Sequence, residues 1–472
     1  MRHLFWIITA IVANTVAAAT TIPPQERSIE GRWTGSISVA GQVLPMAVHF
    51  TTEDAGVTAA IDIQGATGVP LQSVSYDDPA VHFELQGGAG MAVFDGQHVA
   101  DSIGGAFMQA GMAGTFAMTR AAEPEEPAAT DDDPPPYRQE EVLFKNGDVT
   151  LAGTLTLPAT GGPHPAAVMI TGSGAQNRDE ELFGFKPFLV IADHLTRNGI
   201  AVLRYDDRGV GGSSGSVSES TTEDFAGDVI AAVHLLQARP DINGEQVGLI
   251  GHSEGGVVAP LAASRSPDIA FAVLLAGTAV TGEEIIYEQG ELILRANGAT
   301  DAQIARQRES QERLFRAIKT DTGWDDLEVA LRADVRAGLD SMPPEQRSAI
   351  ADPDAYVAAQ VQAQLGSART PWFQYFLTYD PAVALRRIDV PVLALFGELD
   401  LQVPPAQNRP PMEEALRAGG NADYTIEVLP GANHLFITAT TGSPTEYATL
   451  PKEFVPELLP TITEWLLART SR

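Results

Sequence analysis

A proline-rich acidic segment divides this chain into two unlike parts. Residues 121–136 read AAEPEEPAATDDDPPP and contain six acidic residues and five prolines. Such a segment has little apolar surface to bury, and its prolines favour an extended backbone. The sequence therefore predicts an extended linker over residues 121–137, with a separately folded domain on each side of it.

Residues 27–120 show the pattern of short β-strands. Apolar side chains alternate with small or polar ones, and turns rich in glycine and aspartate separate the runs. We expect a small all-β domain, either a barrel or a sandwich of antiparallel strands. Its three histidines, His49, His82 and His98, lack the spacing of metal ligands and are interpreted as strand-face residues.

Residues 138–472 alternate β-rich runs with helical patterns. Strands are predicted at 149–157, 166–171, 201–205, 247–250, 271–275, 392–396 and 424–428, and helices at 179–197, 222–237 and 255–264. This alternation is typical of a mostly parallel, doubly wound sheet that helices cover on both faces. A helical pattern without strands at about 280–380 predicts a helical cap inserted between two strands. The cap ends in the aromatic run PWFQYF, residues 371–376. We expect it to pack the cap onto the sheet, and the alternative is that it lines an apolar pocket.

The first residues predict export. Arg2 precedes an apolar run over residues 4–12, and the small residues Ala17–Ala19 resemble a cleavage site. We interpret residues 1–19 as a signal peptide, with an uncleaved anchor as the alternative. No later run reaches the roughly 18 apolar residues of a membrane-spanning helix. A mature chain in the periplasm or outside the cell, without membrane insertion, is therefore expected.

Charge and cysteine content narrow the classes of partner and chemistry. The chain has 30 basic and 61 acidic residues, a formal charge of -31, so its field repels phosphate. Nucleic acid and anionic membrane surfaces are therefore poor partners, and we expect no nucleic-acid binding. It has no cysteine, which excludes disulfides, thiolate metal sites and a cysteine nucleophile. The sequence gives no indication of the oligomeric state.

Residues 248–257, GLIGHSEGGV, place Ser253 between glycines where an apolar run ends. Gly251, Ser253 and Gly255 form a G-x-S-x-G motif between a predicted strand and a predicted helix, which is the setting of a nucleophile elbow. A serine hydroxyl needs a base to act as a nucleophile. We therefore interpret Ser253 as a catalytic nucleophile.

The base and the acid are sought after the serine in the chain. His434 is the single histidine that follows Ser253, and it comes just after the last predicted strand. The strand at 392–396 runs into Glu398 and Asp400. Asp400 is the preferred acid, since it falls in the loop beyond the strand, and Glu398 is the alternative.

A tetrahedral intermediate needs two backbone donors for its oxyanion. The amide of Glu254 is one candidate, and the amide of Ser173 in the loop GSGAQNRD, residues 172–179, is the other. Ser173 as a competing nucleophile lacks the elbow sequence. The loop over residues 205–213, YDDRGVGGS, lacks a phosphate-binding signature and is interpreted as a structural loop held by Asp207 and Arg208. No ligand pattern indicates a metal, and no cofactor is expected.

Together these stretches resemble the α/β-hydrolase superfamily, and within it the EstD-like exported bacterial carboxylesterases. The resemblance is carried by residues 172–179, 204–215, 251–256, 371–381, 397–403 and 431–436. It implies a triad of Ser253, Asp400 and His434, a cap over the pocket, and hydrolysis of short acyl esters. The β-domain accompanies some relatives, and others are labelled as serine aminopeptidases or dipeptidyl-peptidase-like.

The sequence therefore predicts an exported serine esterase acting on small-molecule esters with short or medium acyl chains. A peptidase or amidase with the same triad is the alternative, with cap acids such as Glu283, Glu284 or Glu288 holding a free amino group. A binding protein on an inactive hydrolase scaffold is the second alternative.

Overall fold

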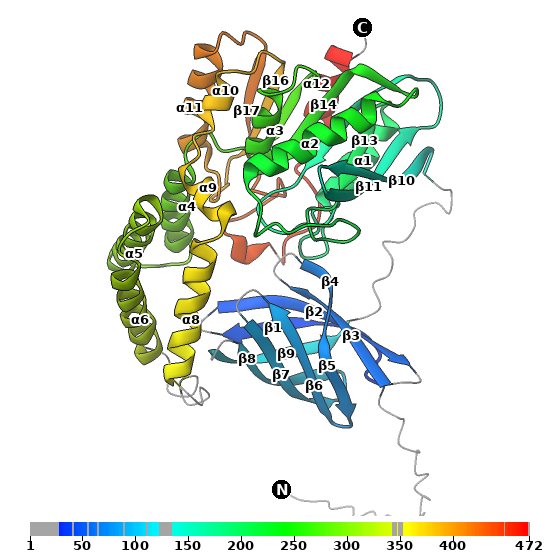
Figure 1. Cartoon of the computed structure of the whole chain (residues 1–472). Helices are drawn as coiled ribbons and strands as arrows, with labels where there is room; N and C mark the ends of the chain where they lie inside the picture. The colour runs from blue at the N-terminus through cyan, green and yellow to red at the C-terminus, as the bar shows by residue number, and fades with distance from the viewer. Residues whose placement is uncertain are drawn as a thin grey trace, which may run out of the picture.

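The computed structural model describes ten stretches of the chain: residues 28–39, 42–53, 56–63, 66–87, 90–109, 112–121, 135–341, 347, 353–447 and 449–470. The predicted signal peptide and most of the predicted linker lie outside these stretches. Two separate sheets hold the described strands, one on each side of the linker (Figure 1).

The N-terminal sheet has nine strands in the order β4-β3-β2-β1-β9-β8-β7-β6-β5, and all neighbouring pairs for which register is defined are antiparallel. The strands are β1 (Gly31–Val39), β2 (Gln42–Glu53), β3 (Gly56–Ile63), β4 (Ala66–Pro70), β5 (Gln72–Asp77), β6 (Ala80–Gly87), β7 (Gly90–Val99), β8 (Ser102–Gln109) and β9 (Met112–Arg120). The two end strands, β4 and β5, are joined by Leu71 alone, whose N–H donates to the carbonyl of Ala59 in β3 at 2.9 Å. One sheet therefore curls back on itself, as in a barrel, and a two-layer sandwich is not formed.

Alternation along these strands separates a core from an outer face. Phe83 and Phe94 point inward, are fully buried, and stack with ring centroids 4.5 Å apart. His98 also faces the core, where its ring bonds Tyr76 Oη at 2.9 Å. His82 lies on the outer face, half-buried beside Asp95 at 2.7 Å. The predicted β-domain is present, and its histidines occupy different faces.

The second sheet has eight strands in the order β10-β11-β13-β12-β14-β15-β16-β17. They are β10 (Tyr137–Asn146), β11 (Val149–Pro158), β12 (His164–Ile170), β13 (Ala201–Tyr205), β14 (Ile242–His252), β15 (Ala272–Leu275), β16 (Val392–Gly397) and β17 (Tyr424–Leu429). The pairs β10–β11 and β11–β13 are antiparallel, and the pairs from β13 to β17 are parallel. All seven predicted strands are observed; β10, an edge strand with one exposed face, was not predicted.

Strand order places helices on both faces of this sheet. The helices outside the cap are α1 (Pro187–Arg197), α2 (Thr222–Gln237), α3 (Gly255–Ala263), α10 (Ala382–Leu385), α11 (Pro405–Ala418) and α12 (Leu458–Thr470), with a 3-10 turn, η1 (Pro444–Glu446). The crossover through α1 runs one way along the sheet, whereas those through α2, α3 and α11 run the other way. Because such crossovers are right-handed, α1 covers one face of the sheet, and α2, α3 and α11 cover the opposite face. The predicted doubly wound α/β fold is confirmed.

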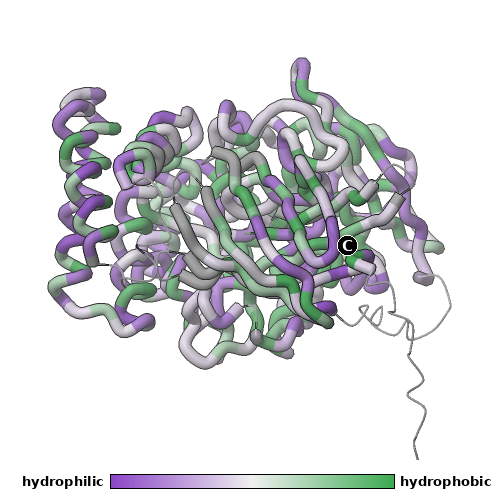
Figure 2. The backbone as a smooth tube through the Cα atoms, turned by 90° about the horizontal axis from the view of Figure 1, so that it is seen from below, coloured by the Kyte–Doolittle hydropathy of each residue, from purple (hydrophilic) through white to green (hydrophobic). Residues whose placement is uncertain are grey.

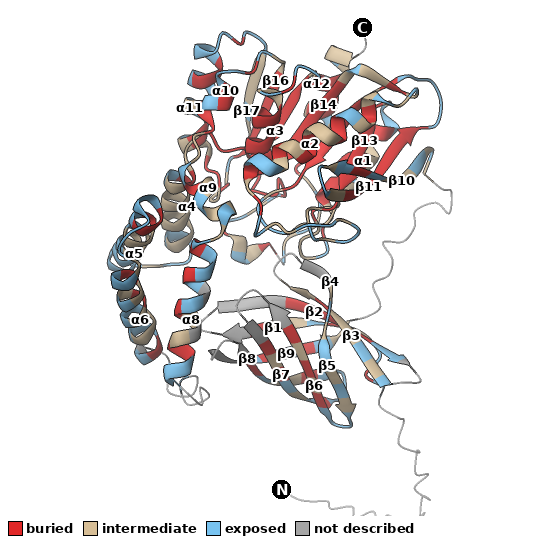
Figure 3. Cartoon of the chain, in the orientation of Figure 1, coloured by how far each residue is buried: buried red, intermediate tan, exposed pale blue. Residues whose placement is uncertain are grey.

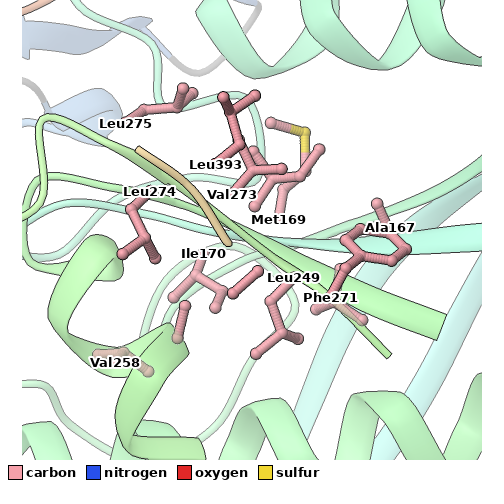
Figure 4. Packing of buried hydrophobic residues seen from close by; sticks show 14 of the residues in the cluster. Ala167, Met169, Ile170, Leu249, Val258, Phe271, Val273, Leu274, Leu275 and Leu393 are labelled. Atoms are coloured by element: carbon pink, nitrogen blue, oxygen red, sulfur yellow. The ribbon is translucent and has the colours of Figure 1, made fainter. Parts of the chain in front are cut away.

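The core lies between the sheet and these helices. The central strands β12, β13, β15 and β16 are almost entirely buried (Figure 3), and Val258 of α3 belongs to the same core cluster as Ile170 and Leu249 of the sheet (Figure 4). Burying one such side chain contributes about 1.5–3 kcal/mol. The helix predicted at 179–197 begins only at Pro187. Glu180 and Phe183 have φ of 51° and 53°, which a helix does not allow, so residues 179–186 form a loop.

The predicted cap is present between β15 and β16. Its helices are α4 (Gly282–Ala296), α5 (Asp301–Thr320), α6 (Trp324–Ser341), α8 (Pro353–Ala368) and α9 (Pro371–Thr378). Hydrophobic and hydrophilic residues alternate along the cap helices (Figure 2), and the apolar ones form clusters of their own. Within the described stretches, no helix has the length and apolar character needed to cross a membrane.

Candidate active site

Ser253 lies in a sharp turn between β14 and α3. Its φ is 54°, a left-handed value that costs a non-glycine residue about 1–3 kcal/mol and that is enriched at active sites. The flanking glycines are needed because chains cross closely here. A Cβ on Gly251 would lie 2.0 Å from the carbonyl oxygen of Gly255, and one on Gly255 would lie 2.1 Å from that of Ile170. The predicted strand-turn-helix setting of the serine is therefore observed.

Asp400 and His434 form a buried pair. Nδ1 of His434 lies 2.9 Å from Oδ2 of Asp400, and both residues are almost fully buried. The other carboxylate oxygen, Oδ1, accepts the N–H groups of Gln402 and Val403 at 2.8 Å each. Glu398, the alternative acid, is exposed and instead accepts the N–H of Gly431 at 2.8 Å. Of the two predicted acids, Asp400 is the one that contacts the histidine.

A cavity of about 490 Å³ lies between the sheet and the cap, and Ser253 and His434 both line it. No hydrogen bond joins these two side chains in the described structure; in free enzymes such bonds often form only when substrate is bound. Much of the remaining wall is apolar. It includes Leu182, Phe183, Ile285, Ile286, Phe376 and Leu435.

The aromatic run of α9 lies on this wall. Trp372, Phe373 and Phe376 line the cavity, and the rings of Trp372 and Phe376 stack 5.4 Å apart. Tyr375 instead stacks on Tyr379 at 5.2 Å. The pocket-lining alternative therefore holds for three of these side chains.

The loop with Ser173 follows β12 and reaches the same cavity. Ion pairs and hydrogen bonds attach it to the loop after β13. Asp206 accepts from the guanidinium of Arg178 at 2.8 and 3.1 Å, and Asp207 accepts from the N–H of Gln176 at 2.9 Å. Arg208 pairs with Asp228 of α2 at 2.7 Å. The structural role predicted for Asp207 and Arg208 is confirmed, and Asp206 shares it.

A second histidine–carboxylate pair, His252 with Glu180, was not predicted. Nδ1 of His252 lies 2.9 Å from Glu180 Oε1, which also accepts the N–H of Gly172 at 2.7 Å. Nε2 of His252 lies 2.9 Å from the carbonyl oxygen of His434. Burial lowers the pKa of His252, but the Glu180 charge and these bonds outweigh burial and raise it. Both ring nitrogens face oxygen acceptors, so a protonated imidazole fits this environment.

The hydrolase part of the chain matches the model of a known family. Residues 186–440, more than half of the 472, fit Hydrolase_4, described as serine aminopeptidase, S33. The chain belongs to this family. Its fold is the α/β-hydrolase fold, as the sheet order and the elbow after β14 already indicated.

This S33-family chain is also similar to individual proteins. It is 28% identical over 308 residues to a protein named esterase EstD from Thermotoga maritima, across 64% of this chain and 63% of EstD. The alignment thus spans less than two thirds of that relative. A proline iminopeptidase structure from Mycobacterium smegmatis is 17% identical, with a TM-score of 0.43, over 70% of this chain and 99% of that one. A Pyrococcus furiosus esterase structure is 15% identical, with a TM-score of 0.42, over 72% and 96%.

Two of the acidic residues of the cap in this S33-family chain, Glu283 and Glu284, form ion pairs or hydrogen bonds within the cap. Glu283 pairs with Lys319 of α5 at 2.6 Å, and Glu284 accepts from Thr281 at 2.7 Å to close the capping box of α4. Neither these two nor Glu288 is among the described residues that line the cavity. The structure therefore does not bring them to the candidate site.

Among the described residues, no group of three or more His, Asp or Glu side chains could hold a metal ion.

Proposed function

We propose that this chain is a serine hydrolase that cleaves carboxylic esters of small molecules, with Ser253, His434 and Asp400 as its triad. The observation that carries the proposal is the Asp400–His434 pair, whose imidazole borders the same cavity as Ser253 in its strained turn. The bond to Asp400 fixes the tautomer of His434, which leaves Nε2 free to accept the serine proton.

The reaction proceeds in two acyl-transfer steps. Ser253 Oγ attacks the ester carbonyl while His434 takes its proton, and the oxyanion that forms accepts the N–H groups of Glu254 and Ser173. His434 then gives the proton to the alcohol as the C–O bond breaks. A water molecule then gives a proton to His434 and attacks the acyl carbonyl. As the acyl–Oγ bond breaks and the acid leaves, His434 returns that proton to Ser253 Oγ.

One feature of the cavity supports short or medium acyl chains, and a second supports esters over peptides as substrates. The cavity of about 490 Å³ has a largely apolar wall suited to an acyl group. An aminopeptidase would also need a carboxylate free to bind an ammonium group. Of the two acids on the cavity wall, Glu254 bonds Trp372 through both carboxylate oxygens. Glu180 bonds His252 and the N–H of Gly172 through Oε1, so only its buried Oε2 has no partner among the described residues.

Hydrolysis of p-nitrophenyl esters from C2 to C12, compared with aminoacyl p-nitroanilides, tests this proposal. We expect turnover of the shorter esters and loss of that turnover in Ser253→Ala. Ser264→Ala is the matched control, because Ser264 caps the end of the same helix and its hydroxyl donates to the carbonyl of Leu261 rather than facing the cavity lining. Dominant anilide turnover would assign a peptidase instead, and ester turnover that survives in Ser253→Ala would refute the assigned nucleophile.

We also propose that the chain is exported and that residues 1–19 are removed. The support is the sequence pattern of Arg2, the apolar run and Ala17–Ala19. The mass of the mature chain after expression in a Gram-negative host tests it. A periplasmic or secreted protein lacking these residues is expected, and a cytoplasmic protein of full length would contradict the proposal.

A further inference from the structure

Glu254 directly follows Ser253, and its carboxylate points away from its own helix. The residue occupies the N-cap position of α3, yet its side chain makes no capping bond. Both carboxylate oxygens instead accept from Nε1 of Trp372 at 3.0 Å, and Oε1 also accepts from Oγ1 of Thr222 at 2.7 Å. One side chain thus joins the elbow to α9 of the cap and to the start of α2.

This carboxylate is buried among neutral donors. Glu254 is 4% exposed, and no ion pair to an arginine or lysine is formed by it within the described stretches. Burial raises its pKa, while hydrogen bonds from Thr222, Trp372 and Ser173 act in the opposite direction. Because a buried charge without a cation is costly, its orientation depends on these few donors.

Trp372 is at the same time part of the cavity wall. It lines the cavity of Ser253 and also a second cavity of about 460 Å³, whose wall includes Gly174 and Thr370. It belongs to α9, and its ring stacks on that of Phe376 one turn further along the same helix. The bond from its N–H to Glu254 is therefore a direct link between the position of the cap and the residue after the nucleophile.

We propose that Glu254 is a positioning residue, which through Trp372 couples docking of the cap to the geometry of the oxyanion hole. This inference rests on the proposed function, in which the amide of Glu254 stabilises the oxyanion. With the Trp372 N–H in place, the carboxylate is held away from the reacting carbonyl. Without that donor, the carboxylate is free to turn toward the cavity, where its negative charge would oppose the oxyanion that the adjacent amide stabilises.

Trp372→Phe tests the coupling, because it keeps an aromatic ring and removes the donor. We expect kcat for p-nitrophenyl acetate, counted per titrated active site, to fall by about ten-fold, because the variant loses one hydrogen bond to a charged group. KM should stay within about two-fold of the wild-type value. Labelling of Ser253 by a fluorophosphonate should slow by a similar factor. Glu254→Gln removes the charge, so the double variant should recover most of the lost kcat.

Trp324→Phe is the matched control. Trp324 is also a cap tryptophan, but its Nε1 donates to Asp321 at 2.9 Å, and it does not line the Ser253 cavity. Its kcat and labelling rate should equal those of the wild type. An unchanged kcat per active site in Trp372→Phe would overturn the proposal, since a purely structural tryptophan lowers only the melting temperature or the active fraction. A fall that Glu254→Gln does not rescue would overturn it as well.

The labelling assay separates this inference from the proposed function. A wild type that is labelled at Ser253 but does not turn over esters would contradict the ester assignment, and the labelling rates of the variants would still decide on the coupling. A wild type that is not labelled at Ser253 would refute both.

Discussion

His252 and His434 are connected through the backbone: Nε2 of His252 lies 2.9 Å from the carbonyl oxygen of His434, and the two rings are 4.8 Å apart. The loop that presents the proposed base is therefore held by a second histidine, which Glu180 holds in turn. This arrangement connects the loop after β12, the end of β14 and the loop after β17, three points far apart in the sequence.

Glu180→Gln should weaken this connection in a pH-dependent way. The pKa of His252 is raised above its usual value of about 6.5, so the pair with Glu180 contributes its full stability below pH ~6.5 and loses it as pH rises through the raised pKa. We expect the free energy of unfolding of the variant to be about 1–3 kcal/mol lower than that of the wild type near pH 6. The difference should be smaller near pH 9. Urea unfolding at the two pH values measures this.

His234→Gln is the control for that experiment. His234 is exposed and lies 3.4 Å from Asp268, so its removal should change stability little at either pH. A Glu180→Gln deficit that stays constant from pH 6 to pH 9 would show that His252 is not the titrating group.

Asp400→Asn should separate orientation of the base from assembly of the site. The amide keeps the size of the side chain, but its NH₂ group competes as a donor to His434, which favours the wrong tautomer. We expect kcat to fall by roughly 10³–10⁴-fold with KM little changed. Glu398→Gln, in the exposed alternative acid, should leave kcat within about two-fold. A larger effect in Glu398→Gln than in Asp400→Asn would reverse the assignment of the acid.

Asp206→Asn should destabilise the loop that carries Ser173. Burial raises the pKa of Asp206, but bonds from the Arg178 side chain and from the N–H groups of Arg178 and Gly212 outweigh burial and lower it. Its contribution is therefore present above the usual pKa of about 3.9 and is lost as pH falls through the lowered value. We expect a loss of about 3 kcal/mol near pH 7 and a smaller loss near pH 3 by urea unfolding.

Glu291→Gln provides the comparison for Asp206→Asn. Glu291 pairs with Arg295 on the exposed surface of α4, where solvent screens the pair and its contribution to stability is small. If Asp206→Asn costs no more than this exposed pair, the loop is not held by Arg178.

Phe376→Ala should enlarge the acyl pocket. Phe376 lines the cavity from the cap, and its removal frees space next to Trp372. We expect the preferred p-nitrophenyl ester to lengthen by about two to four carbons, measured as kcat/KM across the series. Tyr375→Ala, on the same helix but stacked on Tyr379, should keep the wild-type preference. Equal chain-length profiles for Phe376→Ala and the wild type would show that the acyl group binds elsewhere.

Local patterns in the sequence were sufficient to predict seven of the eight strands of the second sheet and to select the three residues of the proposed triad. The G-x-S-x-G stretch around Ser253 needs glycines because chains cross within van der Waals distance there. Asp400 and His434 could be selected because each follows a strand of the parallel part of the sheet, and the ends of parallel strands meet at one edge of a sheet. The apolar strands could be located because a parallel sheet is buried on both faces.

Tertiary structure alone decided the contacts around that triad. Glu180 belongs to a segment with a helical pattern, and only its φ of 51° shows that the backbone turns there to bring the carboxylate to His252, 72 residues away. Trp372 reaches Glu254 across 118 residues, because the cap folds back over the sheet. Hydrophobic period and turn residues are properties of neighbouring positions and are legible in the sequence. Which buried polar group meets which depends on how distant elements pack, and only the folded chain determines it.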